Sequence, residues 1–180
     1  MISITENIQL QAVKIEDQPK LMRLLELIYP PVYKHLWINE DCSFYLNTFY
    51  SLDQLQLELS DPKAAYYFVV YNTNVVGIFR YIYDKPFEDA LHQKSTYLNR
   101  IYLSEAAQGQ GVARALFYWL ETKVKQKGQT VIWLKAMDSQ QQALRFYEKQ
   151  GFSYGSRTHL DFELIHGHLR GMRTLYKRLE

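Results

Sequence analysis

The stretch AAQGQGVARALF, residues 106–117, joins two glycines to the start of an apolar helical pattern. Apolar residues recur every fourth position from residue 112 to residue 124, which predicts an amphipathic helix. Gly109 and Gly111 allow positive φ angles and let a ligand approach the backbone without meeting a Cβ atom. Because the first-turn amides of a helix lack intrahelical partners, such a loop is typical of a diphosphate site. Taken alone, the glycines favour a tight turn with a glycine N-cap.

Two common phosphate-binding loops do not match this stretch. A nucleotide P-loop needs Lys and then Ser or Thr after its last glycine, whereas Val112 and Ala113 follow Gly111. A dinucleotide fingerprint needs a third Gly or Ala where this chain has Arg114, and an acidic residue about twenty positions later. The side chains therefore exclude both loops.

The sequence on either side of the loop predicts one mixed α/β domain. The runs YYFVVY (66–71) and VVGIFRYIY (75–83), joined at NTN, predict a β-hairpin. The run TYLNRIYL (96–103) predicts a strand that leads into the loop, and SQQQALRFYEKQ (139–150) predicts a helix. Further strands are expected at residues 7–13, 130–136, 158–165 and 171–179, and further helices from the Asp17 cap to Pro30 and from the Ser51 cap to Leu59.

Composition limits the class of protein. A formal charge of +2 over 180 residues is too small for a protein that binds nucleic acid through a concentrated basic face. Cys42 is the only cysteine, so an internal disulfide is impossible and a reducing compartment is expected. The N-terminus shows no signal-peptide pattern, and no apolar run reaches the roughly 18 residues of a membrane span. We therefore expect a cytoplasmic protein, with residues 1–180 as one domain.

Two motifs together resemble a known enzyme family. The pattern Gln108-x-x-Gly111-x-Ala113, after a strand and opening a helix, resembles motif A of the GNAT acetyltransferases. The segment ALRFYEKQGF (143–152) resembles that family's Ala-x-x-Phe-Tyr-x-x-x-Gly-Phe segment. The ordered pair covers residues 96–152 and is most similar to the PaiA-type spermidine and spermine acetyltransferases. The resemblance implies the GNAT fold, an α/β (α+β) architecture whose mixed, mostly antiparallel sheet of six to seven strands is flanked by about four helices.

The resemblance also implies a co-substrate and an active site. The co-substrate is acetyl-CoA, and the reaction is transfer of its acetyl group to a primary amine by direct attack in a ternary complex. Tyr147 falls on the family's general-acid position. The pantetheine arm would pair with the edge of strand 96–103, and the pyrophosphate would bind the loop. The implied cofactor-binding residues are Ile101, Tyr102, Leu103, Gln108, Gly109, Gln110, Gly111, Val112, Ala113, Arg114, Gln140 and Ala143.

The sequence departs from the family pattern in two ways. Many members carry a glutamate base on the strand before motif A, but strand 96–103 has no carboxylate. Glu105, Asp84 or a chain of waters could serve, and the sequence does not choose among them. Gln140 stands where the family commonly has Asn, which lengthens the arm that carries the amide.

The acceptor is expected to bind the aromatic segment 29–50, where the family builds its acceptor site. Aromatic faces and carboxylates suit the ammonium groups of a polyamine, which makes Trp37 and Glu40 candidate substrate-binding residues. Aromatic clusters of this kind more often form core than binding cages. A protein N-terminus or lysine as acceptor, or a degenerate CoA-binding sensor domain, remain alternatives. No metal site is expected, because His166 and His168 lack a third ligand. The low net charge and the short apolar runs predict no nucleic-acid partner and no membrane contact. A homodimer is left open.

Overall fold

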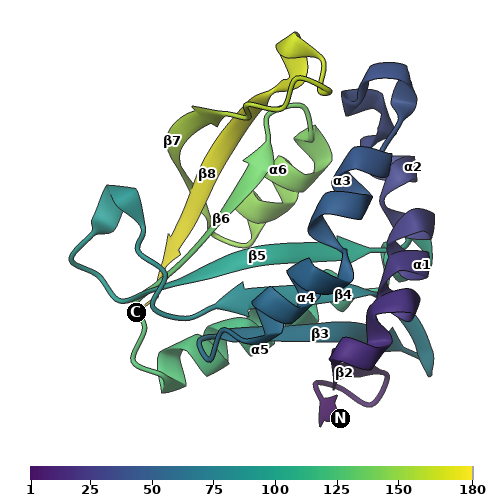
Figure 1. Ribbon diagram of the computed structural model, residues 1–180. Coiled ribbons are helices and arrows are strands. Elements are labelled where there is room, and N and C mark those ends of the chain that lie inside the picture. The colour runs from purple at the N-terminus through teal and green to yellow at the C-terminus, as the bar shows by residue number, and fades with distance from the viewer. Residues whose placement is uncertain (180) are drawn as a thin grey trace. The chain divides into compact units, whose positions relative to one another are not determined.

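The computed structural model describes residues 1–179 (Figure 1). The chain divides into two units, each described in turn. The first unit holds residues 1–81 and 100–116, and the second holds residues 82–99 and the chain from 117 onward. Strand β5 (Ser95–Leu103) and helix α5 (Val112–Gln126) are shared, because each has one end in the first unit and the other end in the second. The expectation of a single domain stays a prediction.

Strands of the first unit follow the order β1-β2-β3-β4-β5. Their bounds are Ile2–Ser3 for β1, Ile8–Ala12 for β2, Ala64–Tyr71 for β3 and Asn74–Ile82 for β4. Strand β2 is antiparallel to both β1 and β3. Asn72 and Thr73 join β3 to β4 with φ angles of 47° and 68°, the two successive positive values that a tight hairpin turn requires.

Helices of the first unit are α1 (Gln18–Ile28), α2 (Pro30–Tyr33), α3 (Ser43–Phe49) and α4 (Leu52–Leu59). Three-residue 3-10 turns occupy Ile15–Asp17, Lys34–Leu36, Ile38–Glu40 and Glu105–Ala107. The predicted Ser51 cap is confirmed, since its hydroxyl accepts a hydrogen bond from the Gln54 amide at 3.2 Å. Pro30 ends α1 as expected, but it also begins the one-turn helix α2, because proline suits the first turn of a helix.

The second unit contains β5, β6 (Val131–Met137), β8 (Gly171–Arg178) and β7 (Ser153–His159), in that order across its sheet. Residues Ser95–Tyr97 of β5 run parallel to Val131–Trp133 of β6, whereas β8 is antiparallel to both β6 and β7. Helix α6 spans Gln141–Lys149, and 3-10 turns occupy Glu88–Ala90 and Gly167–Leu169.

Aromatic packing fills the core of the second unit. Phe87, from the polar loop before β5, stacks on Trp133 with ring centroids 5.7 Å apart. Tyr97 stacks on the same indole at 4.1 Å. The helical stripe of α5 is fully buried, as its spacing predicted, and Phe117 packs edge-on against Phe146 at 5.6 Å.

The expected α/β class and mostly antiparallel sheet are confirmed, but three details were wrong. Residues 1–179 contain eight strands and six α-helices, rather than six to seven strands and about four helices. The strand expected at 158–165 lies at Ser153–His159, and a loop with one 3-10 turn follows it. β7 exposes most of its side chains, so its sequence has no regular alternation of apolar and polar residues. Its pairing with β8 is also interrupted by a register shift between Tyr154 and Arg157. None of the helices within residues 1–179 is long and apolar enough to cross a membrane.

Candidate functional site

The glycine loop opens helix α5 in the way the sequence predicted. Gly109 and Gly111 have φ angles of 71° and 76°, a region that side chains rarely adopt. The Gly111 carbonyl accepts a hydrogen bond from the Ala115 amide at 3.0 Å, which makes Gly111 the N-cap. The amides of Val112 and Ala113 therefore belong to the first turn, where helix geometry provides no acceptor for them.

The loop surface is open and carries donors of the kind that bind an anion. A Cβ atom built on Gly109 or on Gly111 would meet no atom within 4 Å. Arg114 is exposed on the first turn of α5, where its guanidinium suits phosphate oxygens. Gln108 and Gln110 are exposed as well, and Gln110 accepts a hydrogen bond from the Tyr71 hydroxyl at 3.3 Å. These groups fit a diphosphate.

The end of strand β5 lies closely against β4 because β4 has a glycine there. A Cβ atom on buried Gly77 would overlap the carbonyl oxygen of Tyr102 and lie 2.7 Å from the Leu103 side chain. Immediately beyond β5, the Ser104 amide donates to the Val76 carbonyl at 2.8 Å. Ile101, Tyr102 and Leu103 are all half-buried.

Tyr102 belongs to a tyrosine cluster that also contains Tyr29, Tyr33 and Tyr45. The hydroxyl oxygens of Tyr45 and Tyr102 are 2.9 Å apart and share a hydrogen bond. Tyr29 stacks on Tyr33 at 4.6 Å and on Tyr45 at 4.5 Å between ring centroids. Burial raises the pKa of Tyr29 and of Tyr102 well above their ordinary values, so both hydroxyls stay protonated at neutral pH. The cluster is thus a packed group of rings with neutral hydroxyls, in which Tyr29 is buried and Tyr33, Tyr45 and Tyr102 are half-buried.

Trp37 and Glu40 lie in different surroundings. Trp37 is 1% exposed, packs on Tyr45 at 5.8 Å and donates its indole N–H to the Tyr29 hydroxyl at 3.3 Å. Glu40 is exposed, and its carboxylate accepts from the Lys34 ammonium at 2.7 Å. Trp37 therefore supports the tyrosine cluster from within the core, and Glu40 is accessible to solvent. Their roles in binding an acceptor stay predictions.

Sequence reasoning missed a buried ion cluster beside strand β5. Glu58 of α4 is 8% exposed, and its carboxylate accepts from Arg100 at 2.6 Å and lies 3.5 Å from the Arg80 guanidinium. The Arg100 guanidinium also lies over the Tyr50 ring, 4.8 Å from its centroid. Glu58 thus brings to β5 the carboxylate that the strand lacks, but two guanidiniums already engage it. The sequence signal was two arginines within apolar strand patterns, at 80 and 100.

Tyr147 lies in the second unit on helix α6. Its ring packs among Phe117, Phe146 and Phe152, at centroid distances of 5.9, 5.7 and 6.1 Å. This burial raises the pKa of Tyr147 to about 12, so the phenol keeps its proton throughout the physiological range. Gln140 is the N-cap of the same helix and Ala143 is half-buried in its first turns.

The remaining candidates are placed as follows. Glu105 is exposed in the 3-10 turn before the glycine loop, and Asp84 accepts a hydrogen bond from the Gln129 side chain at 2.7 Å. Cys42 is buried, and burial together with nearby acidic groups raises the pKa of its thiol, which disfavours a thiolate nucleophile. Within residues 1–179, no three His, Cys, Asp or Glu side chains converge as a metal site.

Comparison with known proteins bears on this arrangement. The model of the Acetyltransferase (GNAT) family matches residues 20–152. An uncharacterized N-acetyltransferase in the pepI 3' region of Lactobacillus delbrueckii subsp. lactis is 22% identical over 146 residues, covering 81% of this chain and 84% of that protein.

Solved structures with the same fold include enzymes for different acceptors. The PaiA N-acetyltransferase of Thermoplasma acidophilum, in complex with coenzyme A, has a TM-score of 0.72 at 16% identity, covering 95% of this chain and 98% of that one. The spermidine N-acetyltransferase of Vibrio cholerae, with CoA and spermine, has a TM-score of 0.67 at 18% identity and 97% coverage of both chains. An acetyl transferase of Salmonella typhimurium that modifies the N-terminal serine of a ribosomal protein has a TM-score of 0.71 at 15% identity and 99% coverage of both.

Proposed function

Because the chain belongs to the Acetyltransferase (GNAT) family, we propose that it transfers the acetyl group of acetyl-CoA to a primary amine of a small polyamine. N-acetyl transfer with acetyl-CoA is the activity of the family, and the acceptor is the proposed part. Support for a polyamine comes from the spermidine N-acetyltransferase of Vibrio cholerae, whose complex contains spermine.

In this proposal the first unit holds the CoA moiety. The first-turn amides of α5 and the Arg114 guanidinium would bind the pyrophosphate, because the open glycine loop leaves these donors accessible. The main chain of Ile101 and Leu103 would pair with the pantetheine arm. Gln140 and Ala143 stay candidates for further contacts to the cofactor.

The reaction forms a C–N bond and breaks a C–S bond. The amine nitrogen attacks the thioester carbonyl carbon, the CoA sulfur leaves with the electron pair of the C–S bond, and the nitrogen loses one proton. The Tyr147 hydroxyl is the group that would face the sulfur and donate a hydrogen bond to it as negative charge develops.

The tyrosine cluster is the observation that carries the polyamine assignment. Alkylammonium groups are attracted to aromatic faces, and the hydroxyls of Tyr45 and Tyr102 add acceptors for ammonium N–H groups. Glu40 and Asp41 are exposed on the adjoining segment, and an acceptor ammonium would compete with Lys34 for Glu40. An acceptor of two or more ammonium groups separated by methylenes matches this combination of rings and acids.

Thiol release from acetyl-CoA tests the proposal directly. The purified protein would be mixed with spermidine, spermine, or a peptide with a free N-terminal serine. We expect spermidine turnover well above the hydrolysis background, and a higher KM without loss of kcat in Glu40→Gln. Glu26→Gln, an exposed acid on α1, is the matched control. Turnover of the peptide alone would refute the polyamine assignment, and tight acetyl-CoA binding without any turnover would indicate a sensor.

A further inference from the structure

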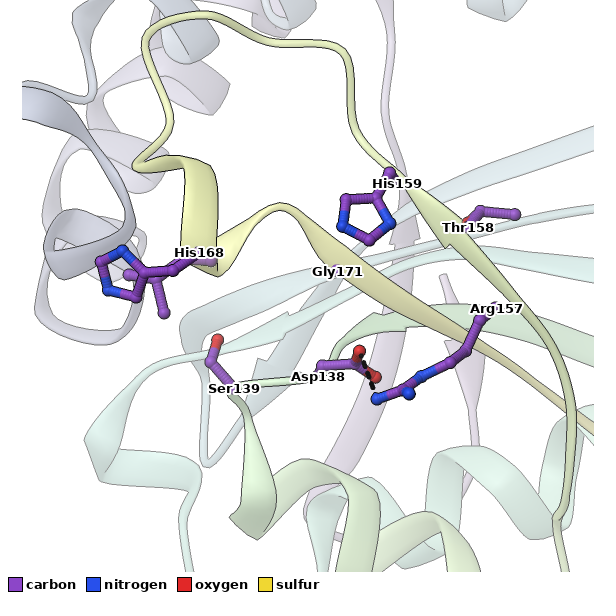
Figure 2. Close-up of a pocket in the computed structure, with 8 residues that line it drawn as sticks. Asp138, Ser139, Arg157, Thr158, His159, His168 and Gly171 are labelled. Carbon is purple, nitrogen blue, oxygen red and sulfur yellow. Dashed lines mark hydrogen bonds and ion pairs between the residues drawn. The ribbon is translucent and has the colours of Figure 1, made fainter.

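The second unit contains a pocket of about 450 Å³ to which the proposed reaction assigns no role (Figure 2). Its walls come from four segments: the end of β6, the end of β7, the 3-10 turn Gly167–Leu169 and the start of β8. The lining side chains that carry charge or hydrogen-bonding groups include Asp138, Ser139, Arg157, His159 and His168.

Asp138, the acidic residue of this lining, is already engaged on both carboxylate oxygens. Oδ2 lies 3.2 Å from Nη2 of Arg157, the ion pair drawn in Figure 2, and Oδ1 lies 3.1 Å from Nε of Arg173. Arg157 belongs to the lining, whereas Arg173 pairs with Asp138 from outside it. Because a guanidinium has five N–H donors and the Arg157 side chain is 64% exposed, Arg157 can hold Asp138 and still donate to a ligand.

The other polar groups of the lining add hydrogen-bond donors. Ser139 has a buried hydroxyl oxygen that finds no hydrogen-bond partner among the described residues. A buried hydroxyl without a partner lowers stability, and a ligand oxygen within reach would satisfy it. His159 ends β7 and His168 lies in the 3-10 turn, and both residues line the pocket. In Figure 2 the imidazole of His168 points away from Asp138 and Arg157.

The loop that forms one wall is held in shape by Arg170. Its Nε donates to the Ile165 carbonyl and its Nη2 to the Glu163 carbonyl, both at 3.0 Å. Ile165 itself is buried, with 2% of its surface exposed. Gly171, at the start of β8, leaves room for the Asp138 carboxylate, because a Cβ atom there would lie 2.6 Å from Oδ2. Arg170 and Gly171 therefore fix the shape of this wall.

We propose that this pocket binds an oxyanion, the carboxylate or phosphate group of a small ligand. A cationic ligand would compete with two arginines for Asp138, the acid of this lining, because Arg157 and Arg173 already engage both of its carboxylate oxygens. Asp161 and Glu163 in the loop are exposed and are not part of the lining. The site goes beyond the proposed function and does not depend on a polyamine acceptor.

A binding titration with inorganic phosphate tests the site on the full chain. Calorimetry would give the affinity, and the imidazole NMR signals of His159 and His168 would locate the bound anion. Saturating CoA is included in a second titration, so that any phosphate bound at the glycine loop is displaced. We expect saturable binding that persists with CoA, shifts the imidazole signal of His159 more than that of His168 and weakens at least tenfold in Arg157→Gln. Arg145→Gln, an exposed arginine of α6 outside the lining, is the control.

The proposal is overturned if phosphate shifts neither imidazole signal, or if Arg157→Gln binds it as tightly as the parent protein.

A second experiment identifies the source of the oxyanion by comparing lysine with cadaverine, two amines that differ only in the α-carboxylate. A lower KM for lysine that disappears in Arg157→Gln assigns the pocket to the carboxylate of an acceptor. Equal KM values together with phosphate binding assign it to a separate anion. If neither amine is acetylated but phosphate still binds, the proposed acetyl transfer fails and the anion site stands, so the two failures can be told apart.

Discussion

Replacing Tyr147 by Phe removes one hydroxyl and leaves the aromatic packing on Phe117, Phe146 and Phe152 in place. The expected loss of kcat follows from the raised pKa of Tyr147, about 12, against about 8.5 for an ordinary thiol. Complete proton transfer from this phenol to the CoA thiolate would be uphill by roughly 5 kcal/mol. We therefore expect Tyr147 to act chiefly as a hydrogen-bond donor to the departing sulfur.

A hydrogen bond to a charged group contributes about 1.5–3 kcal/mol, so Tyr147→Phe should lower kcat by about 10- to 150-fold. Acetyl-CoA affinity should be unchanged, because the donors on the glycine loop are untouched. The raised pKa also fixes the sign of the pH effect. The donating, protonated form is retained as pH rises, and it is lost only near pH 12. The profiles of parent and variant should therefore run parallel from pH 6 to pH 10.

Thiol release at saturating substrates, measured from pH 6 to pH 10, gives kcat and its dependence on pH. Tyr118→Phe, an exposed tyrosine on α5, is the matched control and should keep full activity. Two results would refute the reasoning. A loss beyond about a thousandfold, with a basic limb present in the parent and absent in the variant, would mean full proton transfer by a tyrosine of lower pKa. An unchanged kcat would mean that the hydroxyl does not face the sulfur.

Three further predictions concern stability, the cofactor strand and the amine. Glu58→Gln should lower the free energy of unfolding in urea by about 3–5 kcal/mol, because two buried guanidiniums lose their counter-charge, whereas Glu26→Gln should change it by less than about 0.5 kcal/mol. Gly77→Ala should lower Tm and raise the Kd for CoA at least tenfold, because the added methyl overlaps the Tyr102 carbonyl, while Gly167→Ala should do neither. For spermidine, kcat/KM should rise tenfold per pH unit from pH 6 to pH 9; a plateau above pH 7 would reveal a protein base.

Features encoded by neighbouring residues were predictable from the sequence. The apolar stripe of α5 appears at a spacing of four, and the glycines before it adopt the positive φ angles that their position suggested. Ser51 and Gln54 lie three apart, so the cap of α4 could be read directly. The turn at Asn72 and Thr73 was predictable from the two β-rich runs on either side of it.

Features that depend on tertiary contact were not predictable in this way. The pocket around Asp138 gathers segments from four elements, and nothing in the order of residues pairs Asp138 with Arg157 rather than with another arginine. β7 was misplaced for a related reason, since SYGSRTH becomes a strand only by pairing with β8. Trp37 could equally have been core or cage until its burial was known.

The ion cluster accounts for the carboxylate that Glu58 brings beside strand β5. Arg100 occupies that strand, and a buried arginine is stable only with a counter-charge, which Glu58 provides from helix α4. A carboxylate that neutralises two guanidiniums cannot accept the amine proton without leaving both uncompensated. Unless Glu105, Asp84 or a chain of waters takes the proton, the amine must reach the thioester already neutral, and only one in ~2,500 alkylamines is neutral at pH 7. An α-amino group, with a pKa of about 8, is neutral far more often. Without such a base, the basicity of the acceptor limits the rate at neutral pH, whichever surface of the protein binds it.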